Sequence, residues 1–367
     1  MNNNNQSRIG TPITRFRENY RALDRRGKVA WWGDFFVKNA IYIIIIILVI
    51  YVQVYSIQRG FTNTFLSFDS IIDIVKRAGS SMFLALGIGG IIVLTGTDLS
   101  AGRIMGLTAC ISASLLQRAD FGVKMFPDLA VPPIILVLLF VMALGGIVGI
   151  VNGFFVSKFK LHPFIVTLAT SIILNGIVLW YVQLGRNGGG PIAGLTEEYT
   201  RVVKDNFMIG GTAIPYYVFY AIVATAIMWF IWNKTTLGKN MYAVGANPEA
   251  ANVSGVSIMK TTIFIFTIAG LLYGFSGFVD AARIGSNGPT TGVMAELDAI
   301  AACVIGGVSF TGGTGKISGI VTGVILIQII DVALQWLSIS SDMKLVITGA
   351  LILIAVTIDM RKYLAKK

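Results

Sequence analysis

Apolar and polar residues follow one another along this chain in long blocks, and the apolar blocks are the first guide to its structure. Ten apolar segments stand out, at about 40–57, 81–95, 104–117, 132–156, 164–184, 213–232, 261–280, 297–310, 317–337 and 345–358. A helix needs about 20 apolar residues to cross a bilayer, and several of these segments are shorter. The pattern predicts an all-α, polytopic membrane protein with about ten transmembrane or partly membrane-spanning helices.

The composition agrees with this prediction and argues against an enzyme. The chain is 55% hydrophobic and only 13% charged, whereas soluble domains carry about a quarter charged residues. Its single histidine, His162, and its two cysteines, Cys110 and Cys303, provide neither a disulfide framework nor a metal cluster. No catalytic constellation is visible, so we expect a non-catalytic protein with no metal site.

The net charge of +11 is distributed as in a membrane protein, not as in a nucleic-acid-binding one. Basic residues are dense before the first apolar segment and after the last, as in cytoplasmic tails. We therefore predict a basic N-terminal tail over 1–39, a transmembrane domain over 40–360 and a C-terminal tail over 361–367. With ten crossings both termini are cytoplasmic, and most of the 29 Lys and Arg residues lie on that side.

Glycines recur in two related blocks and raise the question of a nucleotide site. The stretch SFTGGTGKIS, residues 309–318, contains Gly-Lys, but a phosphate-binding loop would need a glycine at Phe310 and a hydroxyl at Ile317. The block instead repeats an earlier one at an offset of 217, with these pairs aligned: Gly89 and Gly306, Gly90 and Gly307, Gly96 and Gly313, Gly102 and Gly319, Gly106 and Gly323. Paired, interrupted apolar segments point to the translocation region of a transporter. We predict helix breaks at Gly96, Gly102, Gly312 and Gly313; tight cytoplasmic turns and close helix packing are the alternatives.

One long loop, over 233–260, lies on the predicted cytoplasmic side and contains NPEAANVSGV. Asn247 can cap a helix whose first residue is Pro248, and Glu249 lies in the first turn, where an anion is favourable. Gly255 would end this helix. A short capped helix tethered between membrane helices can transmit movement from a docked partner, although the loop could equally be an inert connection.

Polar residues within or beside the apolar segments are candidates for the translocation pathway, because ionisable groups in a membrane are costly. They are Asp98, Arg103, Asn152, Asn175, Glu296, Asp298, Gln328 and Asp331. Asp98 and Arg103 could instead form a structural ion pair, and the amides and Asp331 could join helices to one another. Glu296 and Asp298 are expected at the outer end of a short segment.

Three blocks together resemble one family. GTDLSAGRIMGL (96–107), YAVGANPEAANVSGV (242–256) and ELDAIAACVIGGVSFTGG (296–313) are similar to the membrane subunits of bacterial sugar ABC importers of the ribose/galactose group. The resemblance covers roughly residues 40–365. It implies that a coupling helix docks on an ATPase subunit through Asn247, Pro248, Glu249, Ala250, Ala251 and Gly255.

The resemblance also implies the partners and the substrate of the transporter. The partners would be an ATPase subunit that holds ATP and magnesium, a soluble sugar-binding protein, a second copy of this chain and the lipid of the inner membrane. A hexose such as galactose, glucose or methyl-galactoside is favoured as substrate, with ribose, a nucleoside or another small polyol as alternatives. An ion-coupled secondary transporter is the alternative from another class, with Asp331 as the one obvious mid-segment carboxylate.

Overall fold

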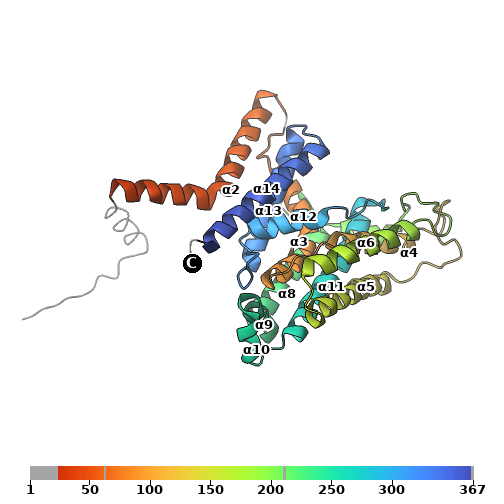
Figure 1. Cartoon of the computed structure of the whole chain (residues 1–367). Helices are drawn as coiled ribbons and strands as arrows, with labels where there is room; N and C mark the ends of the chain where they lie inside the picture. The colour runs from red at the N-terminus through yellow and green to blue at the C-terminus, as the bar shows by residue number, and fades with distance from the viewer. Residues whose placement is uncertain (1–23, 62, 210–211, 365–367) are drawn as a thin grey trace, which may run out of the picture. The chain divides into compact units, whose positions relative to one another are not determined.

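The computed structural model describes residues 24–61, 63–209 and 212–364, and the regular secondary structure of this part of the chain is almost entirely helical (Figure 1). The helices are α2 (Arg25–Gln58), α3 (Phe68–Val93), α4 (Ala101–Leu115), α5 (Ile134–Lys158), α6 (Pro163–Tyr181), α7 (Glu197–Lys204), α8 (Tyr216–Lys234), α9 (Thr236–Ala246), α10 (Pro248–Val253), α11 (Ile258–Ile284), α12 (Ala295–Ile305), α13 (Ile317–Trp336) and α14 (Ser341–Leu364). The chain forms two units that divide between Ile47 and Leu48, within α2, and the sites described below lie in the second.

The predicted all-α membrane fold is confirmed. Each of the ten apolar segments overlaps a helix, and among the described residues five helices are long and apolar enough to cross a membrane by length and composition, namely α5, α6, α8, α11 and α13. Two strands, β1 (Asn206–Ile209) and β2 (Thr212–Pro215), pair antiparallel between α7 and α8.

Four helices differ in extent from the prediction. α2 begins at Arg25, so the described part of the predicted tail 1–39 is largely helical, and α14 continues to Leu364. α3 has 26 residues, about 39 Å at 1.5 Å per residue, because it begins well before the apolar stretch at 81. α12 has only 11 residues and is about 16 Å long, roughly half the thickness of a hydrocarbon core.

An irregular segment over 285–294 precedes the short helix α12 and runs beside α4. The thiol of Cys110 on α4 lies 3.6 Å from the carbonyl oxygen of Gly288, and a Cβ on Gly102 would overlap the carbonyl of Gly292. Extended backbone is tolerated at membrane depth where protein surrounds it. The segment therefore brings the first residue of α12, Ala295, to the N-terminal end of α4.

Glycines also allow α5 and α11 to pack with their backbones in contact. A Cβ on Gly145 would overlap the carbonyl oxygen of Gly270, and a Cβ on Gly270 would overlap that of Gly145. One turn further on, Gly149 lies against the carbonyl of Phe266 in the same way. Small residues at membrane helix interfaces permit such close approach.

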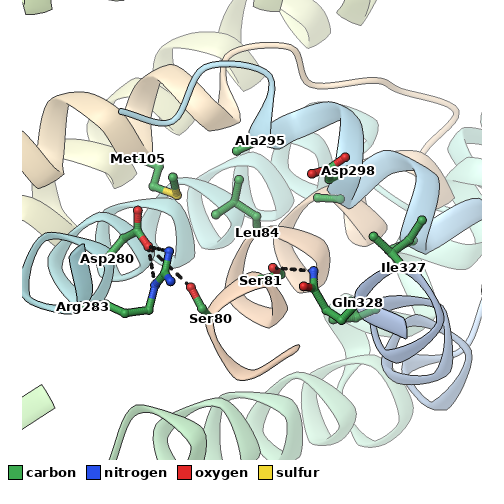
Figure 2. Close-up of a pocket in the computed structure, with 13 residues that line it drawn as sticks. Ser80, Ser81, Leu84, Met105, Asp280, Arg283, Ala295, Asp298, Ile327 and Gln328 are labelled. Atoms are coloured by element: carbon green, nitrogen blue, oxygen red, sulfur yellow. Dashed lines mark hydrogen bonds and ion pairs between the residues drawn. The ribbon is translucent and has the colours of Figure 1, made fainter. Parts of the chain in front are cut away.

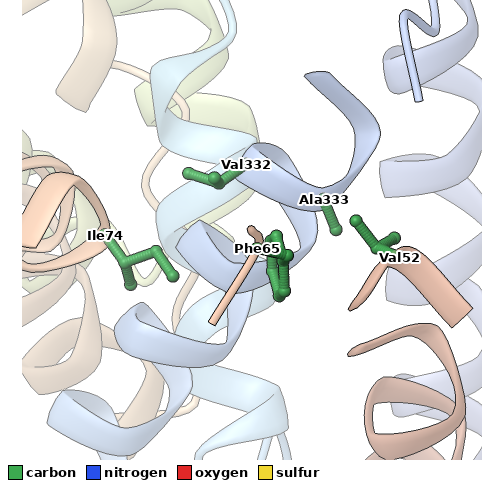
Figure 3. Packing of buried hydrophobic residues seen from close by; sticks show 5 residues of the cluster. All are labelled: Val52, Phe65, Ile74, Val332 and Ala333. Carbon is green, nitrogen blue, oxygen red and sulfur yellow. The ribbon is translucent and has the colours of Figure 1, made fainter. Parts of the chain in front are cut away.

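A smaller hydrophobic cluster joins the second half of α2 to α3 and α13 (Figure 3). Its buried members are Val52, Phe65, Ile74, Val332 and Ala333. The ring of Phe65 also meets that of Trp336 edge-on, with centroids 6.4 Å apart. This cluster packs the N-terminal part of α3 against the C-terminal part of α13, two of the helices that build the candidate site.

Candidate translocation and coupling sites

A polar cavity of about 140 Å³ lies among α3, α4, α11, α12 and α13. Its polar lining side chains are Ser80, Ser81, Asp280, Arg283, Asp298 and Gln328 (Figure 2). Two of them, Asp298 and Gln328, were predicted as pathway residues. The cavity thus brings together residues that lie up to 248 positions apart in the chain, from Ser80 to Gln328.

Hydrogen bonds and one ion pair order the walls of this cavity. Asp280 and Arg283 are three residues apart on α11, and their Oδ1 and Nη2 atoms are 2.7 Å apart. The hydroxyl of Ser80 donates to the same Oδ1 at 3.5 Å, at the limit of a hydrogen bond. On the opposite side, Nε2 of Gln328 donates to the hydroxyl of Ser81 at 3.1 Å, as Figure 2 shows.

A second hollow, of about 450 Å³, adjoins the cavity on the side of α14. Met105, Ala295 and Asp298 line both spaces, so they form the neck between them. The lining of this hollow also includes Lys344 of α14. The ammonium nitrogen of Lys344 is 2.8 Å from Oδ2 of Asp331 and 3.5 Å from Oδ2 of Asp298.

Asp98 belongs to a different, closed network. It accepts hydrogen bonds from the backbone N–H of Ser100 at 2.9 Å and from its hydroxyl at 2.6 Å. Asn152 of α5 donates to that hydroxyl at 3.0 Å and accepts from Thr170 of α6 at 2.6 Å. Asn152 therefore joins helices, the alternative that the sequence left open.

The suggested ion pair between Asp98 and Arg103 is not formed. Among the ion pairs of the described residues none joins these two side chains, and Arg103 instead donates to the carbonyl oxygen of Pro289 at 3.1 Å. Arg103 thereby holds the irregular segment against α4. Asn175 is half-buried on α6, away from the cavity.

Glu296 is half-buried in the first turn of α12. Its carboxylate rests against Gly102, where a Cβ would overlap Oε2. That oxygen is buried and has no hydrogen-bond partner among the residues that the structure describes. Asp298, two residues further along α12, is a third exposed and lines both hollows.

The four predicted helix-break glycines fall into two groups. Gly312 and Gly313 have φ of 81° and 66° and lie in the turn between α12 and α13, so the break is confirmed there. Gly96 lies in the turn after α3, although the left-handed residue of that turn is Thr95, with φ of 63°. Gly102 does not break a helix: it lies inside α4, and its missing side chain admits Gly292 and Glu296.

The predicted capped helix on the long loop is present as α10. Asn247 is its N-cap and accepts from the backbone N–H of Ala250 at 3.0 Å, with Pro248 as the first helical residue. Glu249 lies exposed in the first turn, and Gly255 follows the helix with φ of 84°. The sequence reading missed α9, which immediately precedes α10 and is comparatively polar.

The end of α9 is packed into both turns of the glycine repeat, a contact that the sequence did not reveal. The N–H of Gly313, in the second turn, donates to the carbonyl oxygen of Val93, at the end of α3, at 2.9 Å. Gly245 of α9 lies against this hydrogen bond. A Cβ on Gly245 would be 2.8 Å from the amide nitrogen of Gly313 and would overlap the carbonyl oxygen of Val93. The hydroxyl of Tyr242 also donates to the carbonyl of Gly315 at 2.9 Å. We call Val93, Tyr242, Gly245, Gly313 and Gly315 the α9 junction.

Three charged residues near the cavity were missed, and two of them carried a sequence signal. Asp280 and Arg283 stand three apart at the end of an apolar segment, a spacing at which helical side chains meet. Lys344 gave no such signal, because its partners lie on other helices. No group of three or more His, Cys, Asp or Glu in the described ranges could hold a metal ion.

Comparison with known proteins gives the family. A family model described as "Branched-chain amino acid transport system / permease component" matches residues 70–356, and the chain belongs to this permease family. It is thus a multi-pass membrane protein of the group to which the three sequence blocks pointed.

Individual relatives narrow the comparison. The chain is 43% identical over 304 residues to the galactose/methyl galactoside import permease protein MglC of Escherichia coli (strain K12), covering 83% of this chain and 90% of that protein. It is 41% identical to the protein of the same name from Haemophilus influenzae, covering 91% and 97%. The ribose import permease protein RbsC of H. influenzae is 32% identical, covering 91% and 96%. No solved structure is significantly similar to the chain.

Proposed function

We propose that this chain is the membrane subunit through which an ATP-driven importer moves galactose or a closely related hexose. The observation that supports a galactose-type substrate is sequence identity: 37–43% to galactose/methyl galactoside permeases against 30–33% to ribose permeases. Ribose import is the second candidate, because those permeases also match along most of their length.

The chain itself is proposed to be a non-catalytic conduit. ATP and magnesium would be bound by a separate ATPase subunit, which docks on α10 from the cytoplasm through Asn247, Pro248, Glu249, Ala250, Ala251 and Gly255. Two copies of the chain would form the translocation unit in the inner membrane, with both termini cytoplasmic. A soluble sugar-binding protein would deliver substrate to the opposite face.

The α9 junction supports this coupling role. α10 is exposed apart from Ala251, so its capped first turn is available to a partner. Its base, the end of α9, touches the turns that end α3 and begin α13. A displacement of α10 is therefore passed to the helices that line the polar cavity.

The alternative of an ion-coupled secondary transporter has less support. Such a transporter needs carboxylates that gain and lose a proton along a relay. Asp331, the carboxylate suggested for that role, is paired with Lys344 at 2.8 Å. This ion pair gives Asp331 a structural role in joining α13 to α14.

The test is uptake of radiolabelled galactose and ribose by cells that express this chain with its ATPase and binding protein. Glu249→Lys should abolish uptake while the protein remains in the membrane, because it reverses the charge of the docking turn. Glu198→Lys is the matched control, since Glu198 is also exposed in the first turn of a short helix. Uptake that stops with an uncoupler at constant ATP, and is indifferent to Glu249, would contradict the proposal.

A further inference from the structure

The charged side chains around the polar cavity are paired with one another, and this restricts what the cavity can bind. Its lining carries two carboxylates, Asp280 and Asp298, and one guanidinium, Arg283. Arg283 pairs with Asp280, whose side chain is 8% exposed, while Lys344 lies 3.5 Å from Asp298 and 2.8 Å from Asp331, so carboxylates outnumber cations here. An anionic ligand would add to this excess of negative charge or take a cation from its carboxylate, which is strongly unfavourable in a buried site.

A neutral polyhydroxylated ligand does not meet this obstacle. Sugar hydroxyls donate to carboxylates and accept from guanidinium and amide groups, and bonds to the charged partners are the stronger kind. The walls supply acceptors on Asp280 and Asp298, donors on Arg283 and Gln328, and a hydroxyl on Ser81 that can do either. These groups come from α3, α11, α12 and α13, so they surround the space and are not confined to one face.

The cavity also has a suitable size and an approach. The volume of about 140 Å³ is many times the roughly 10–15 Å³ that a single water needs, so the cavity has room for a small polar ligand. The adjoining hollow of 450 Å³ leads to it past the neck of Met105, Ala295 and Asp298. Met105 is unbranched and flexible, which allows a neck to open and close around a ligand.

We propose that this cavity is a binding station for one neutral monosaccharide, entered through the neck formed by Met105, Ala295 and Asp298. The inference rests on the proposed function for the direction and purpose of transport. It adds a substrate site on the membrane subunit itself, built on the Asp280–Arg283 pair and the Ser81–Gln328 hydrogen bond.

The first test is protection of a cysteine placed in the cavity wall. The complex of this chain with its ATPase is reconstituted in proteoliposomes without binding protein, and Ser80→Cys is reacted with a small methanethiosulfonate reagent. Galactose at ten times its Kd should slow the reaction about tenfold, because only empty cavities react. Asn206→Cys, exposed on β1, should react at the same rate with or without galactose. The wild-type chain gives the background, since Cys110 and Cys303 are both buried.

The outcomes separate this site from the proposed function. Galactose import by the wild type with no protection at Ser80→Cys overturns the site and leaves the function standing. Protection by galactose without import supports the site and overturns the function. Leucine is tested as well, because the family description names branched-chain amino acids. Protection by leucine and not by galactose overturns the monosaccharide assignment.

A second measurement applies even if the introduced thiol proves unreactive. Gln328→Leu removes the amide that donates to Ser81, and import at subsaturating galactose should fall about tenfold for the loss of one good hydrogen-bonding group. Gln335→Leu is the matched control: it lies on the same helix, pairs with Arg77 and is outside the cavity, so import should be unchanged. Equal import by both variants, at equal amounts in the membrane, would overturn the proposal.

Discussion

Adding a single methyl group at Gly245 should disturb the α9 junction, because Gly245 touches backbone atoms of two other segments. In Gly245→Ala the new Cβ would be 2.8 Å from the amide nitrogen of Gly313 and would overlap the carbonyl oxygen of Val93. Neither neighbour is the end of a flexible side chain that could turn aside. The Gly313–Val93 hydrogen bond, 2.9 Å long, must therefore open or α9 must move outward.

The expected cost follows from these two contacts. Overpacking in a well-packed region costs about 1–3 kcal/mol, and the loss of one backbone hydrogen bond adds about 1 kcal/mol. The assay is galactose import by proteoliposomes that contain the whole importer, with ATP hydrolysis measured in parallel. Since about 1.4 kcal/mol corresponds to a factor of ten, we expect the import rate to fall at least about tenfold. ATP hydrolysis should continue, so that more ATP is used for each sugar moved.

A control variant distinguishes this effect from a general sensitivity to added methyl groups. Gly176 lies within α6, and a Cβ there meets no atom within 4 Å. Gly176→Ala should leave import unchanged and slightly stabilise the helix, by up to about 1 kcal/mol. If Gly245→Ala imports galactose at the wild-type rate with the same ratio of ATP used to sugar moved, the junction does not transmit the movement of α10.

Two further variants test the polar networks. Lys344→Met should lower the free energy of unfolding by about 2 kcal/mol. This is less than the roughly 3–5 kcal/mol of a fully buried pair, because the lysine side chain is 31% exposed. Adding Asp331→Asn should restore part of the lost stability, and a double variant as unstable as Lys344→Met alone would contradict the ion pair. Asn152→Leu removes the acceptor of the Thr170 hydroxyl and the donor to the Ser100 hydroxyl, which keeps its bond to Asp98, and should cost about 1–3 kcal/mol. The matched variant Asn175→Leu, at a half-buried site, should cost much less stability. Thermal inactivation of the purified protein compares these variants, including the double one, with the wild type.

The local features of this fold were predictable because they depend on neighbouring residues. α10 could be placed from Asn247, Pro248 and Gly255, since a cap, a first-turn proline and a terminating glycine act within one or two turns. The ten apolar segments likewise locate helices, since burial in lipid requires a continuous apolar stretch. The lengths of α3 and α12 could not be read in this way, because polar residues extend the first and an irregular approach shortens the second.

The candidate site was only partly predictable, because its geometry depends on contacts between distant segments. Asp298 and Gln328 could be chosen as polar residues in apolar surroundings, but nothing near them in the sequence indicates that Arg283 and Lys344 pair with the carboxylates around the cavity. Asn152 gave the same sequence signal as Gln328 and yet serves to join helices. A polar residue in a membrane segment marks a position of interest, and only its partners decide its role.

The contact between α5 and α11 has a practical consequence for measuring motion. No side chain separates their backbones where Gly145 meets Gly270 and where Gly149 meets Phe266, so no change of rotamer can let one helix turn against the other. Two spectroscopic labels, one on each helix, should keep a constant separation through the whole transport cycle. The pair would then act as an internal ruler, against which any displacement of a third label on α12 can be read.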